Sequence, residues 1–543
     1  MENISEISEF IFRITSWTIG NSYRRYEYQN VVLQFTFLKR LNDVLAFSKK
    51  DVIHSYEDNT NKKDLIHPLL IEKAIDTNGK QLGFYNYSRF DFQTLLKDPE
   101  NIEENIKSYI NSFSDNVKDI LTNFDMEKHI VKLSEDHALY NLIEIFETSI
   151  DLSPKTISNQ DMGILFEELM FEAIERNNRS YNYYSTPKDV VKLMTELLFI
   201  EKDETQDSIK TVYDPACGIG EKLNSCKEFV IKNNPRMRVE LYGQELNKEI
   251  YALCKANMLM KGENIENIKG PSSTLSDDQF SSNKFDYIIY AMPRGKWAED
   301  KEKIRAEAKL GYDGRFWAGV PFMGSEYLFI QHMLSKMKDN DKSRIVIPVH
   351  SGFLTHSYRF KLLDWILEND YLEAVIALPE KLFFNVSNEM YIVTLTNQKN
   401  EKRKGKVQLI DARAKFNEMK QRMNGKENEI DKKSLNKIIR YYKNFKENNN
   451  VKIFNNEDFR FKQITINRPL KLNYQVANER LKKVIENDHF RGLAKSSNRN
   501  LEIKRRKEKE GREKQKKIKK ALLSIGDDIY TNKNVLKKKS KKR

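Results

Sequence analysis

The pattern of apolar residues changes near Lys210, and this change constrains the fold more than any other feature of the chain. Before it, apolar residues recur at three- and four-residue steps, as amphipathic helices require. After it, short apolar runs alternate with helical stretches, and these runs are 211–213, 239–242, 285–290, 344–349, 372–378, 391–395 and 407–410. Such alternation indicates βαβ units and a mostly parallel sheet. We therefore predict an α/β fold preceded by an all-helical N-terminal domain.

The spacing within each part predicts individual elements and boundaries. Helices are expected over Ile4–Ile14, Val31–Leu41, Asn101–Phe113 and His137–Thr148. The last apolar runs are close together, which suggests antiparallel hairpin pairing at one edge of the sheet. From Asn478 the chain reads as a charged helix plus tail, since the mixed-sign stretch 502–520 is typical of a solvated helix. The predicted domains are residues 1–157, 158–480 and 481–543.

The basic excess of the chain lies almost entirely in its last 45 residues. The whole chain has a formal net charge of +14, and residues 499–543 carry 19 basic and six acidic side chains, a net of +13. The remainder is therefore close to neutral, which excludes a uniformly cationic protein. Such a tail suggests a polyanion partner such as nucleic acid. The alternative is a solvated, solubilising tail.

Several classes are disfavoured by composition. No apolar run approaches the roughly 18 residues of a membrane helix, and the N-terminus has acids where a signal peptide has a basic segment. Three cysteines, Cys217, Cys226 and Cys254, form neither a disulfide framework nor a zinc spacing. The eight histidines show no metal-ligand spacing. We expect a cytoplasmic protein without a membrane segment or a metal site.

Two sequence features lie where a parallel sheet binds ligands, just after its strands. The first is Tyr213–Gly220, a glycine-containing turn that allows a ligand close to the backbone. The second is Glu245, about 30 residues on, at a position that suits a ribose diol. The alternatives are an ordinary tight turn and an ordinary carboxylate at a helix start. Cys217, within the turn, is expected to be a small packed residue rather than a nucleophile.

A series of segments in a fixed order makes the resemblance to a family specific. They are YEYQNVVLQFTFLKRLNDVL, FYNYSRFDFQTLLKDPENIEENIKSYINSFS, ISNQDMGILFEELM, Thr186–Val190, YGQELNKEIYALCKANMLMKG, TLSDDQ, RKGKVQLIDA and INRPLKLNYQ. Together they resemble the modification (methyltransferase) subunit of type I restriction–modification systems, enzymes that methylate adenine N6 in DNA. The resemblance covers nearly the whole chain.

The resemblance implies a fold, a cofactor and partners. The fold is a class I S-adenosylmethionine-dependent methyltransferase, Rossmann-like, after a helical domain, and here it is followed by a basic helical C-terminal tail. The cofactor is S-adenosylmethionine, and by resemblance its contacts are Thr186, Asp214, Pro215, Gly218, Gly220 and Glu245. The partners are DNA, a specificity-type subunit bound partly through the C-terminal region, and a restriction or effector subunit or a second modification subunit.

The chain departs from the family at the catalytic motif. Where the family has Asn-Pro-Pro followed by Phe or Tyr, this sequence has Ala291, Met292, Pro293 and Arg294. In the family, the Asn side chain and a Pro carbonyl accept hydrogen bonds from the target amine, and the aromatic ring stacks on the extruded base. The Ala291 side chain has no acceptor and Arg294 has no ring, although a guanidinium stacks on bases or pairs with phosphates.

The cofactor elements depart as well. The family turn reads Asp-Pro-x-x-Gly-Thr-Gly-Gly, and here Ile219 and Glu221 replace the Thr and the last Gly. Glu221 adds bulk and negative charge near the expected methionine carboxylate. Further departures fall at Gly270–Ser273, at Ser387–Glu389 and at Ser185.

Because the changes cluster around one pocket, we favour a catalytically impaired (pseudo) adenine-N6 methyltransferase that acts in a prokaryotic restriction or defence complex by binding DNA and partner subunits. The alternative is an active site-specific DNA adenine-N6 methyltransferase subunit with a remodelled pocket. Methylation of protein or RNA is a third class that the fold allows. Tyr181, Tyr183 and Tyr184, near Arg176 and Arg179, form either a nucleic-acid stacking surface or the cover of a domain junction.

Overall fold

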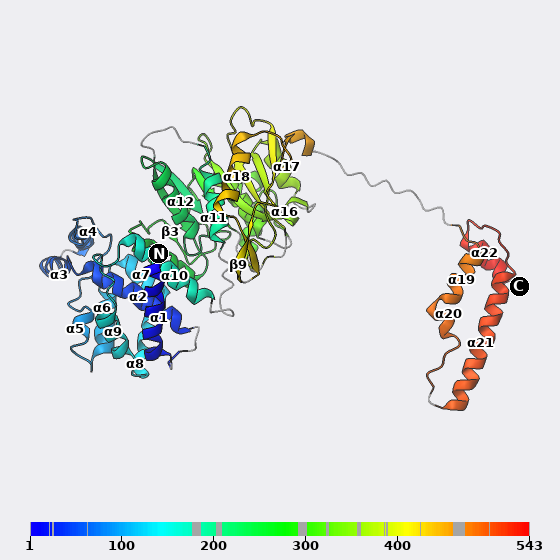
Figure 1. Cartoon of the computed structure of the whole chain (residues 1–543), viewed down its shortest axis with the longest axis horizontal. Coiled ribbons are helices and arrows are strands. Elements are labelled where there is room, and N and C mark those ends of the chain that lie inside the picture. The colour runs from blue at the N-terminus through cyan, green and yellow to red at the C-terminus, as the bar shows by residue number, and fades with distance from the viewer. Residues whose placement is uncertain are drawn as a thin grey trace. The chain divides into compact units, whose positions relative to one another are not determined.

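The computed structural model comprises two compact units, Met1–Arg460 and Phe461–Arg543. Figure 1 shows the whole chain coloured from blue at the N-terminus to red at the C-terminus. The structure describes residues 2–20, 22–23, 27–61, 63–175, 186–201, 209–291, 301–321, 325–355, 360–384, 386, 389–423, 425–459, 473–498 and 500–541.

The N-terminal part of the first unit is helical, and its helices gather together in Figure 1, coloured blue to teal. They are α1 (Glu2–Ile19), α2 (Glu27–Leu45), α3 (Lys49–Asp58), α4 (Lys63–Lys73), α5 (Phe92–Leu95), α6 (Ile102–Asn111), α7 (Asp115–Asn123), α8 (Met126–Glu135), α9 (Leu139–Ser149) and α10 (Asn159–Glu175). The four predicted helical stretches are confirmed as α1, α2, α6 and α9.

Helix α2 lies at the centre of this helical part and carries a buried cation. Most of its residues are buried, and it packs against α1, α9, α10 and α13 (Lys248–Met260). Its Arg40 is buried and donates to the carbonyls of Leu152 and Ile157 and to the Asn159 Oδ1 atom (2.6 Å). Because hydrogen bonds from a charged donor are strong, Arg40 stabilises the position of residues 152–159, which lead from α9 into α10.

The rest of the first unit is built on a mixed sheet of nine strands in the described part of the chain. The order is β11-β8-β6-β7-β5-β4-β1-β2-β3. The strands are β1 (Ile209–Asp214), β2 (Arg238–Gln244), β3 (Ile268–Lys269), β4 (Tyr287–Ile289), β5 (Arg344–His350), β6 (Leu372–Ala377), β7 (Met390–Thr396), β8 (Lys406–Asp411) and β11 (Val451–Asn455). A separate antiparallel ribbon pairs β9 (Asn417–Met423) with β10 (Lys426–Glu429).

The predicted strands are confirmed, with one difference in where the antiparallel pairing falls. Strand β7 pairs antiparallel with both β5 and β6, so the hairpin partner is inserted inside the sheet. The outermost strand on that side is β11, which runs antiparallel to β8. Spacing along the chain indicates that two runs form a hairpin, but it does not say which side of the first strand the second strand takes.

The sheet separates two hydrophobic cores. Alternate residues of one strand point to opposite faces, and in β5 the Val346 side chain joins one core while Ile345 and Ile347 join the other. The first core is continuous with the N-terminal helices and includes α11 (Lys188–Leu198), α12 (Glu221–Asn233) and α13. The second includes α15 (Glu326–Ser335) and α17 (Phe360–Glu368). The helices on both faces of a mostly parallel sheet confirm the predicted α/β class.

The remaining helices of this unit are short or peripheral. They are α14 (Lys301–Ala308), α16 (Ser351–Thr355) and α18 (Lys432–Asn444), of which α18 packs against α11 and β8. No helix in the described ranges combines the length and the apolarity that a bilayer span demands.

The second unit is a helical structure with its own packing. Its helices are α19 (Asn478–Glu486), α20 (Asp488–Gly492), α21 (Leu501–Leu523) and α22 (Lys533–Lys541). Tyr474 and Tyr530 exchange two backbone hydrogen bonds (2.7 and 2.8 Å) that join its two ends. The predicted solvated helix over 502–520 is confirmed as the body of α21. The predicted boundaries 1–157, 158–480 and 481–543 stay a prediction.

Candidate functional site

The turn after β1 is shaped by two glycines in the left-handed region. Gly218 has φ 58° and Gly220 has φ 82°, values that favour glycine over residues with a Cβ. A Cβ on Gly220 would also lie 3.1 Å from the Cys254 Sγ atom of α13, so the turn approaches that helix closely. The turn leads directly into α12, so the strand–turn–helix order that the sequence predicts is present.

Asp214 ends β1 and is completely buried. Its Oδ1 atom accepts a hydrogen bond from the Ala216 amide (3.0 Å), and its Oδ2 atom lies 3.1 Å from the Nζ atom of Lys222 in the first turn of α12. Burial raises the pKa of Asp214, and Lys222 and the Ala216 amide act in the opposite direction. Burial lowers the pKa of Lys222, but Asp214, together with Cys217 and Glu221, raises it by more, so the pKa of Lys222 is raised on balance. The two groups therefore form a buried ion pair.

Glu245 follows β2 and is bonded back to the turn. Its Oε2 atom accepts from the Gly218 amide (3.0 Å) and its Oε1 atom from the Asn247 amide (2.8 Å). Burial raises the pKa of Glu245, although the backbone donors oppose this. The structure thus brings the predicted Asp214, Pro215, Gly218, Gly220 and Glu245 together at the carboxyl ends of β1 and β2. Their roles toward a ligand stay predictions.

The segment 270–281, which contains the TLSDDQ residues, is hydrogen-bonded to the ends of β1 and β2. The Ser272 amide donates to the Glu245 carbonyl (3.0 Å), and the Gln244 side chain donates to the Ser272 Oγ atom (2.8 Å). The Thr274 hydroxyl donates to the Pro215 carbonyl (2.6 Å). These three bonds fix the segment against the ends of both strands.

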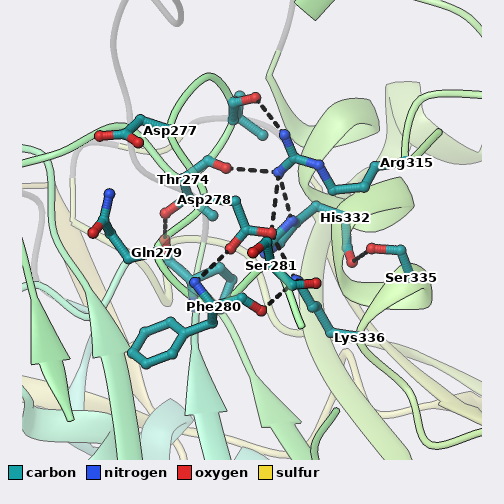
Figure 2. Close-up of polar contacts among 12 residues, drawn as sticks. Thr274, Asp277, Asp278, Gln279, Phe280, Ser281, Arg315, His332, Ser335 and Lys336 are labelled. Carbon is teal, nitrogen blue, oxygen red and sulfur yellow. Dashed lines mark hydrogen bonds and ion pairs between the residues drawn. The ribbon is translucent and has the colours of Figure 1, made fainter. Parts of the chain in front are cut away.

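Arg315 holds the same segment from the other side (Figure 2). Its guanidinium donates to the carbonyls of Thr274 (2.8 Å) and Leu275 (3.0 Å) and to both carboxylate oxygens of Glu307 (2.6 Å each). It also donates to the His332 Nδ1 atom (3.0 Å). A planar fork with five donors suits this arrangement, which lysine cannot reproduce. Arg315 thereby connects residues 301–321, which follow the predicted motif at 291–294 in sequence, to the segment 270–281.

His332 and Lys336, near the end of α15, extend this network to Tyr213 and Asp278. Burial lowers the pKa of His332 well below its usual range, so the imidazole is neutral. Since Arg315 donates to Nδ1, the Nε2–H group donates to the Tyr213 hydroxyl (3.0 Å). Lys336 pairs with Asp278 (2.6 Å) and donates to the Phe280 carbonyl (2.6 Å), as Figure 2 shows.

Ala291 stands directly beyond β4, which lies beside β1 in the sheet. The parallel register pairs Tyr213 with Ile288, so Ala291 follows at the same edge as Asp214. Tyr290 is buried and stacks on Phe329 (4.8 Å between ring centroids). Burial raises the pKa of the Tyr290 hydroxyl, which has no hydrogen-bond partner among the described residues. Met292, Pro293 and Arg294 lie outside the described residues.

Thr186 is buried and lies two residues before α11, whose Asp189 binds the Lys426 Nζ atom (3.0 Å). α11 packs against α12, β4 and β5, which lie beside the predicted pocket. The role of Thr186 toward the cofactor stays a prediction. The remaining predicted positions lie outside the described residues, and these are Arg176, Arg179, Tyr181, Tyr183, Tyr184, Ser185, Ser387 and Asn388.

Cys217 is a packed residue, as the sequence suggests. It is buried, and its Sγ atom lies 3.9 Å from that of Cys254. The neighbouring Cys254 thiol, together with burial, raises the pKa of Cys217 well above its usual range. A thiol in this state is a poor nucleophile at neutral pH.

Sequence reasoning missed Lys222 and Arg315. Lys222 had a recognisable signal, because it shares one helical stripe with Cys226 and Val230 at four-residue steps, and all three are buried. A lysine on a buried stripe requires an anionic partner. Arg315 had no such signal, because the two backbone carbonyls that it holds lie about 40 residues earlier in the chain.

S-adenosylmethionine, which the resemblance implies, contains an adenosine and a cationic amino-acid part. Glu245 fits the ribose hydroxyls, because each carboxylate oxygen has further acceptor capacity beyond one backbone donor and the residue is only partly buried by surface area. Asp214 does not offer a comparable group, since it is inaccessible and already paired with Lys222. No cluster of three or more potential metal ligands occurs in the part of the chain that the structure describes.

Comparisons with protein families agree with this architecture. The N-6 DNA methylase family model matches residues 157–488, and the HsdM N-terminal domain model matches residues 7–146. The first match covers the sheet and its helices, and the second covers the N-terminal helices.

Individual proteins show the same similarity. The chain is 27% identical over 430 residues to the type I restriction enzyme MjaVII methylase subunit of Methanocaldococcus jannaschii, across 77% of this chain and 70% of that protein. It is 25% identical over 454 residues to the MpnII methylase subunit of Mycoplasma pneumoniae, across 78% of this chain and 75% of that protein. A solved structure of the type I restriction-modification system methyltransferase subunit from Streptococcus thermophilus superposes with a TM-score of 0.63 at 20% identity, covering 84% of this chain and 96% of that one.

Proposed function

Since the chain belongs to the N-6 DNA methylase family and has the domain order of a type I modification subunit, we propose that it is a subunit of a DNA restriction or defence complex with impaired methyl transfer. In this role it binds DNA, a specificity-type subunit and a restriction or effector subunit. S-adenosylmethionine is the cofactor expected for this family, and when bound it supplies an electrophilic methyl group. Thr186, Pro215, Gly218, Gly220 and Glu245 are the proposed contacts, and Asp214, which is buried and paired with Lys222, is proposed to hold the turn.

The observation that carries the proposal is Ala291 at the end of β4. The position lies at the same sheet edge as the turn after β1, where a target amine must meet the methyl donor. Adenine N6 is a poor nucleophile because its lone pair is delocalised into the ring, so acceptors that hold its hydrogens matter for the rate. A methyl side chain accepts no hydrogen bond, and losing one positioned polar group costs about 10²–10³ in rate.

The second unit supports a role in assembly. Several large apolar side chains are exposed on it, including Leu501 (69%), Ile529 (62%) and Leu523 (53%). Large apolar side chains that are exposed on so small a unit are candidates for contact with a partner. The curated relatives are methylase subunits of type I restriction enzymes, so a specificity-type subunit is the proposed partner of this surface.

Labelled methyl transfer to DNA in the presence of the partner subunits tests the catalytic part of the proposal. We expect no transfer above background by the unchanged chain. We expect measurable transfer by the combined variant Ala291→Asn and Arg294→Phe, because it restores the acceptor and the stacking ring. Adding Glu245→Ala to that variant is the control, and it should remove the restored activity by removing the ribose acceptor.

Transfer by the unchanged chain would overturn the impairment and favour the alternative, an active site-specific DNA adenine-N6 methyltransferase. Failure of both chains to transfer methyl groups while both bind DNA and the specificity-type subunit would leave the assembly role in place. Failure to bind either partner would contradict the assembly role itself.

A further inference from the structure

Helix α18 presents a face of uninterrupted positive charge, although the chain before residue 499 is nearly neutral as a whole. Residues 432–446 contain six basic side chains and no acidic one. All six are exposed, and they are Lys432, Lys433, Lys437, Arg440, Lys443 and Lys446. The first five lie on the helix itself. At about 3.6 residues per turn, these five fall within one half of the helix surface.

The opposite face of α18 fixes the direction of this basic face. Its Leu435, Ile438, Ile439 and Tyr442 side chains are buried, and the helix packs against α11 and β8. An amphipathic helix held by its apolar stripe directs the other side to solvent. The basic face is therefore open to a partner.

The cations of α18 lack the intrahelical partners that the other strongly basic helix has. In α21, acids lie three or four residues from cations, as in the Arg506–Glu510 pair. In α18, Lys437 instead lies four residues after Lys433 and three before Arg440. Like charges at these spacings repel and destabilise a helix. An external polyanion would relieve this repulsion.

Two acids from the surroundings act on the basic face, and they leave it positive. They are Asp431 at the N-cap and Glu196 of α11. The Asp431 carboxylate accepts a hydrogen bond from the Ser434 amide (3.0 Å). Across the described ranges, neither acid forms an ion pair with a side chain of α18.

The basic face begins beside the sheet edge at which Ala291 lies. In β10, just before the helix, the Glu427 amide donates to the carbonyl of Lys381 (2.9 Å), which follows the carboxyl end of β6. Near the other end of the helix, the Tyr442 hydroxyl accepts from Arg344 (2.9 Å), the first residue of β5. Helix α18 therefore runs from the carboxyl ends of these strands toward their amino ends. A duplex with its target base at Ala291 can continue along this face.

We propose that the basic face of α18 binds the phosphate backbone of double-stranded DNA beside the site at Ala291. From Lys432 to Lys443 the helix is about 16 Å long, and a duplex carries about one phosphate charge per 1.7 Å of its axis. The row of cations thus matches a row of about ten phosphates. This inference rests on the proposed function, because it takes DNA as the polyanion.

Fluorescence anisotropy of the full chain with a labelled duplex, at several salt concentrations, tests the proposal. The variant replaces Lys433, Lys437 and Arg440 by Gln. If each side chain neutralises one phosphate, the slope of log K against log salt should become shallower by about 2.7, which is about 0.9 for each contact. At a fixed salt concentration the Kd should rise about tenfold or more, and by the same factor on duplexes of unrelated sequence.

Lys437→Glu separates DNA binding from helix stability. The new carboxylate lies four residues after Lys433 and three before Arg440, so it replaces repulsion by attraction. The Tm should therefore equal or exceed that of the unchanged chain, while the Kd for the duplex should rise. A purely structural role of Lys437 predicts the opposite, a lower Tm together with weaker binding, and would overturn the proposal.

The matched control replaces Lys50, Lys73 and Lys97 by Gln. These lysines of the helical part are exposed, and each has an acid beside it in the sequence. The control removes as many positive charges as the α18 variant without touching the basic face, so the slope should stay unchanged.

A slope change below about 0.9 in the α18 variant, less than one phosphate contact, would overturn the proposal, as would an equal change in the control. Loss of the specificity-type subunit in place of DNA would also overturn it and would assign the face to a protein partner. DNA binding that the α18 variant retains in full would leave the proposed function intact. Failure of the unchanged chain to bind the duplex would contradict both, so the two failures are distinguishable.

Discussion

Two histidines are neutral for the same physical reason, although they serve different regions. His332 joins Arg315 to Tyr213, and His129 of α8 lies 3.1 Å from the Tyr23 hydroxyl in the helical part. Burial lowers the pKa of His129 to about 4 and that of His332 well below its usual range. A protonated His332 imidazole would lose the acceptor that Arg315 needs.

His129 makes stability depend on pH in a window that its pKa defines. The unfolded chain binds the proton below about 6.5, and the folded chain does so only below about 4. The free energy of unfolding should therefore fall as pH falls from about 6.5 to 4, by about 1.4 kcal/mol per pH unit for this group. Thermal unfolding measured between pH 7 and 4.5 gives this pH dependence. In His129→Gln, the part of it that comes from binding one proton should disappear.

The matched control is His54→Gln on α3, because the His54 side chain is 80% exposed. An equal effect of both substitutions, or none from His129→Gln, would show that His129 does not titrate in this window.

At the scale of elements, close packing requires a glycine in the middle of helix α21, although the chain makes no turn there. A Cβ on Gly511, in the middle of this helix, would lie 1.7 Å from the Leu493 carbonyl oxygen. The Gln515 side chain donates to the Phe490 carbonyl (2.5 Å) one turn further on. The segment after α20 therefore packs directly on the α21 backbone.

Gly511→Ala should destabilise the second unit, against the usual rule that alanine favours an exposed helix by about 1 kcal/mol. The clash is with backbone and cannot be relieved by a side-chain rotation, so a cost of about 1–3 kcal/mol is expected. Tryptic cleavage within 473–541, in the full chain, should accelerate by roughly 5–100-fold. Gly492→Ala, whose Cβ meets nothing within 4 Å, should cleave at the original rate; acceleration in both variants would contradict the packing argument.

Prediction of the elements from sequence succeeded where apolar patterning is strong. All seven apolar runs are strands. Strands β3, β9 and β10 were not predicted, because β3 has only two residues and β9 and β10 are polar, so these three strands have no apolar pattern. The insertion of β7 between β5 and β6 could not be predicted either, because strand order depends on contacts between distant segments.

At the scale of the whole molecule, charge is distributed unevenly. The near-neutral remainder contains the predicted pocket, and residues 499–543 carry a net of +13. Many of the basic side chains of α21 are exposed, among them Lys516, Lys517, Lys519 and Lys520. If DNA is bound through these residues, the contacts are with phosphates and do not depend on base sequence.

Removing residues 499–543 should weaken DNA binding across all sequences and flatten its salt dependence. Since truncation also removes α21, the sharper variant replaces Lys516, Lys517, Lys519 and Lys520 by Gln and leaves the helix in place. The slope of log K against log salt should become shallower by about 0.9 for each phosphate that the protein no longer neutralises. The measurement is fluorescence anisotropy at several salt concentrations, and an unchanged slope in both variants would identify the tail as a solubilising segment.

The sequence alone was enough to predict the class of fold, the turn after the first strand and the absence of an acceptor at Ala291, because these depend on residue type and short-range spacing. It did not reveal that Lys222 pairs with Asp214, that Arg315 holds Thr274 and Leu275, or that β7 lies inside the sheet. Each of these features depends on the order of the strands and the packing of the helices. Short-range patterns do not specify either, because both are decided by contacts between segments that the chain brings together only when it folds.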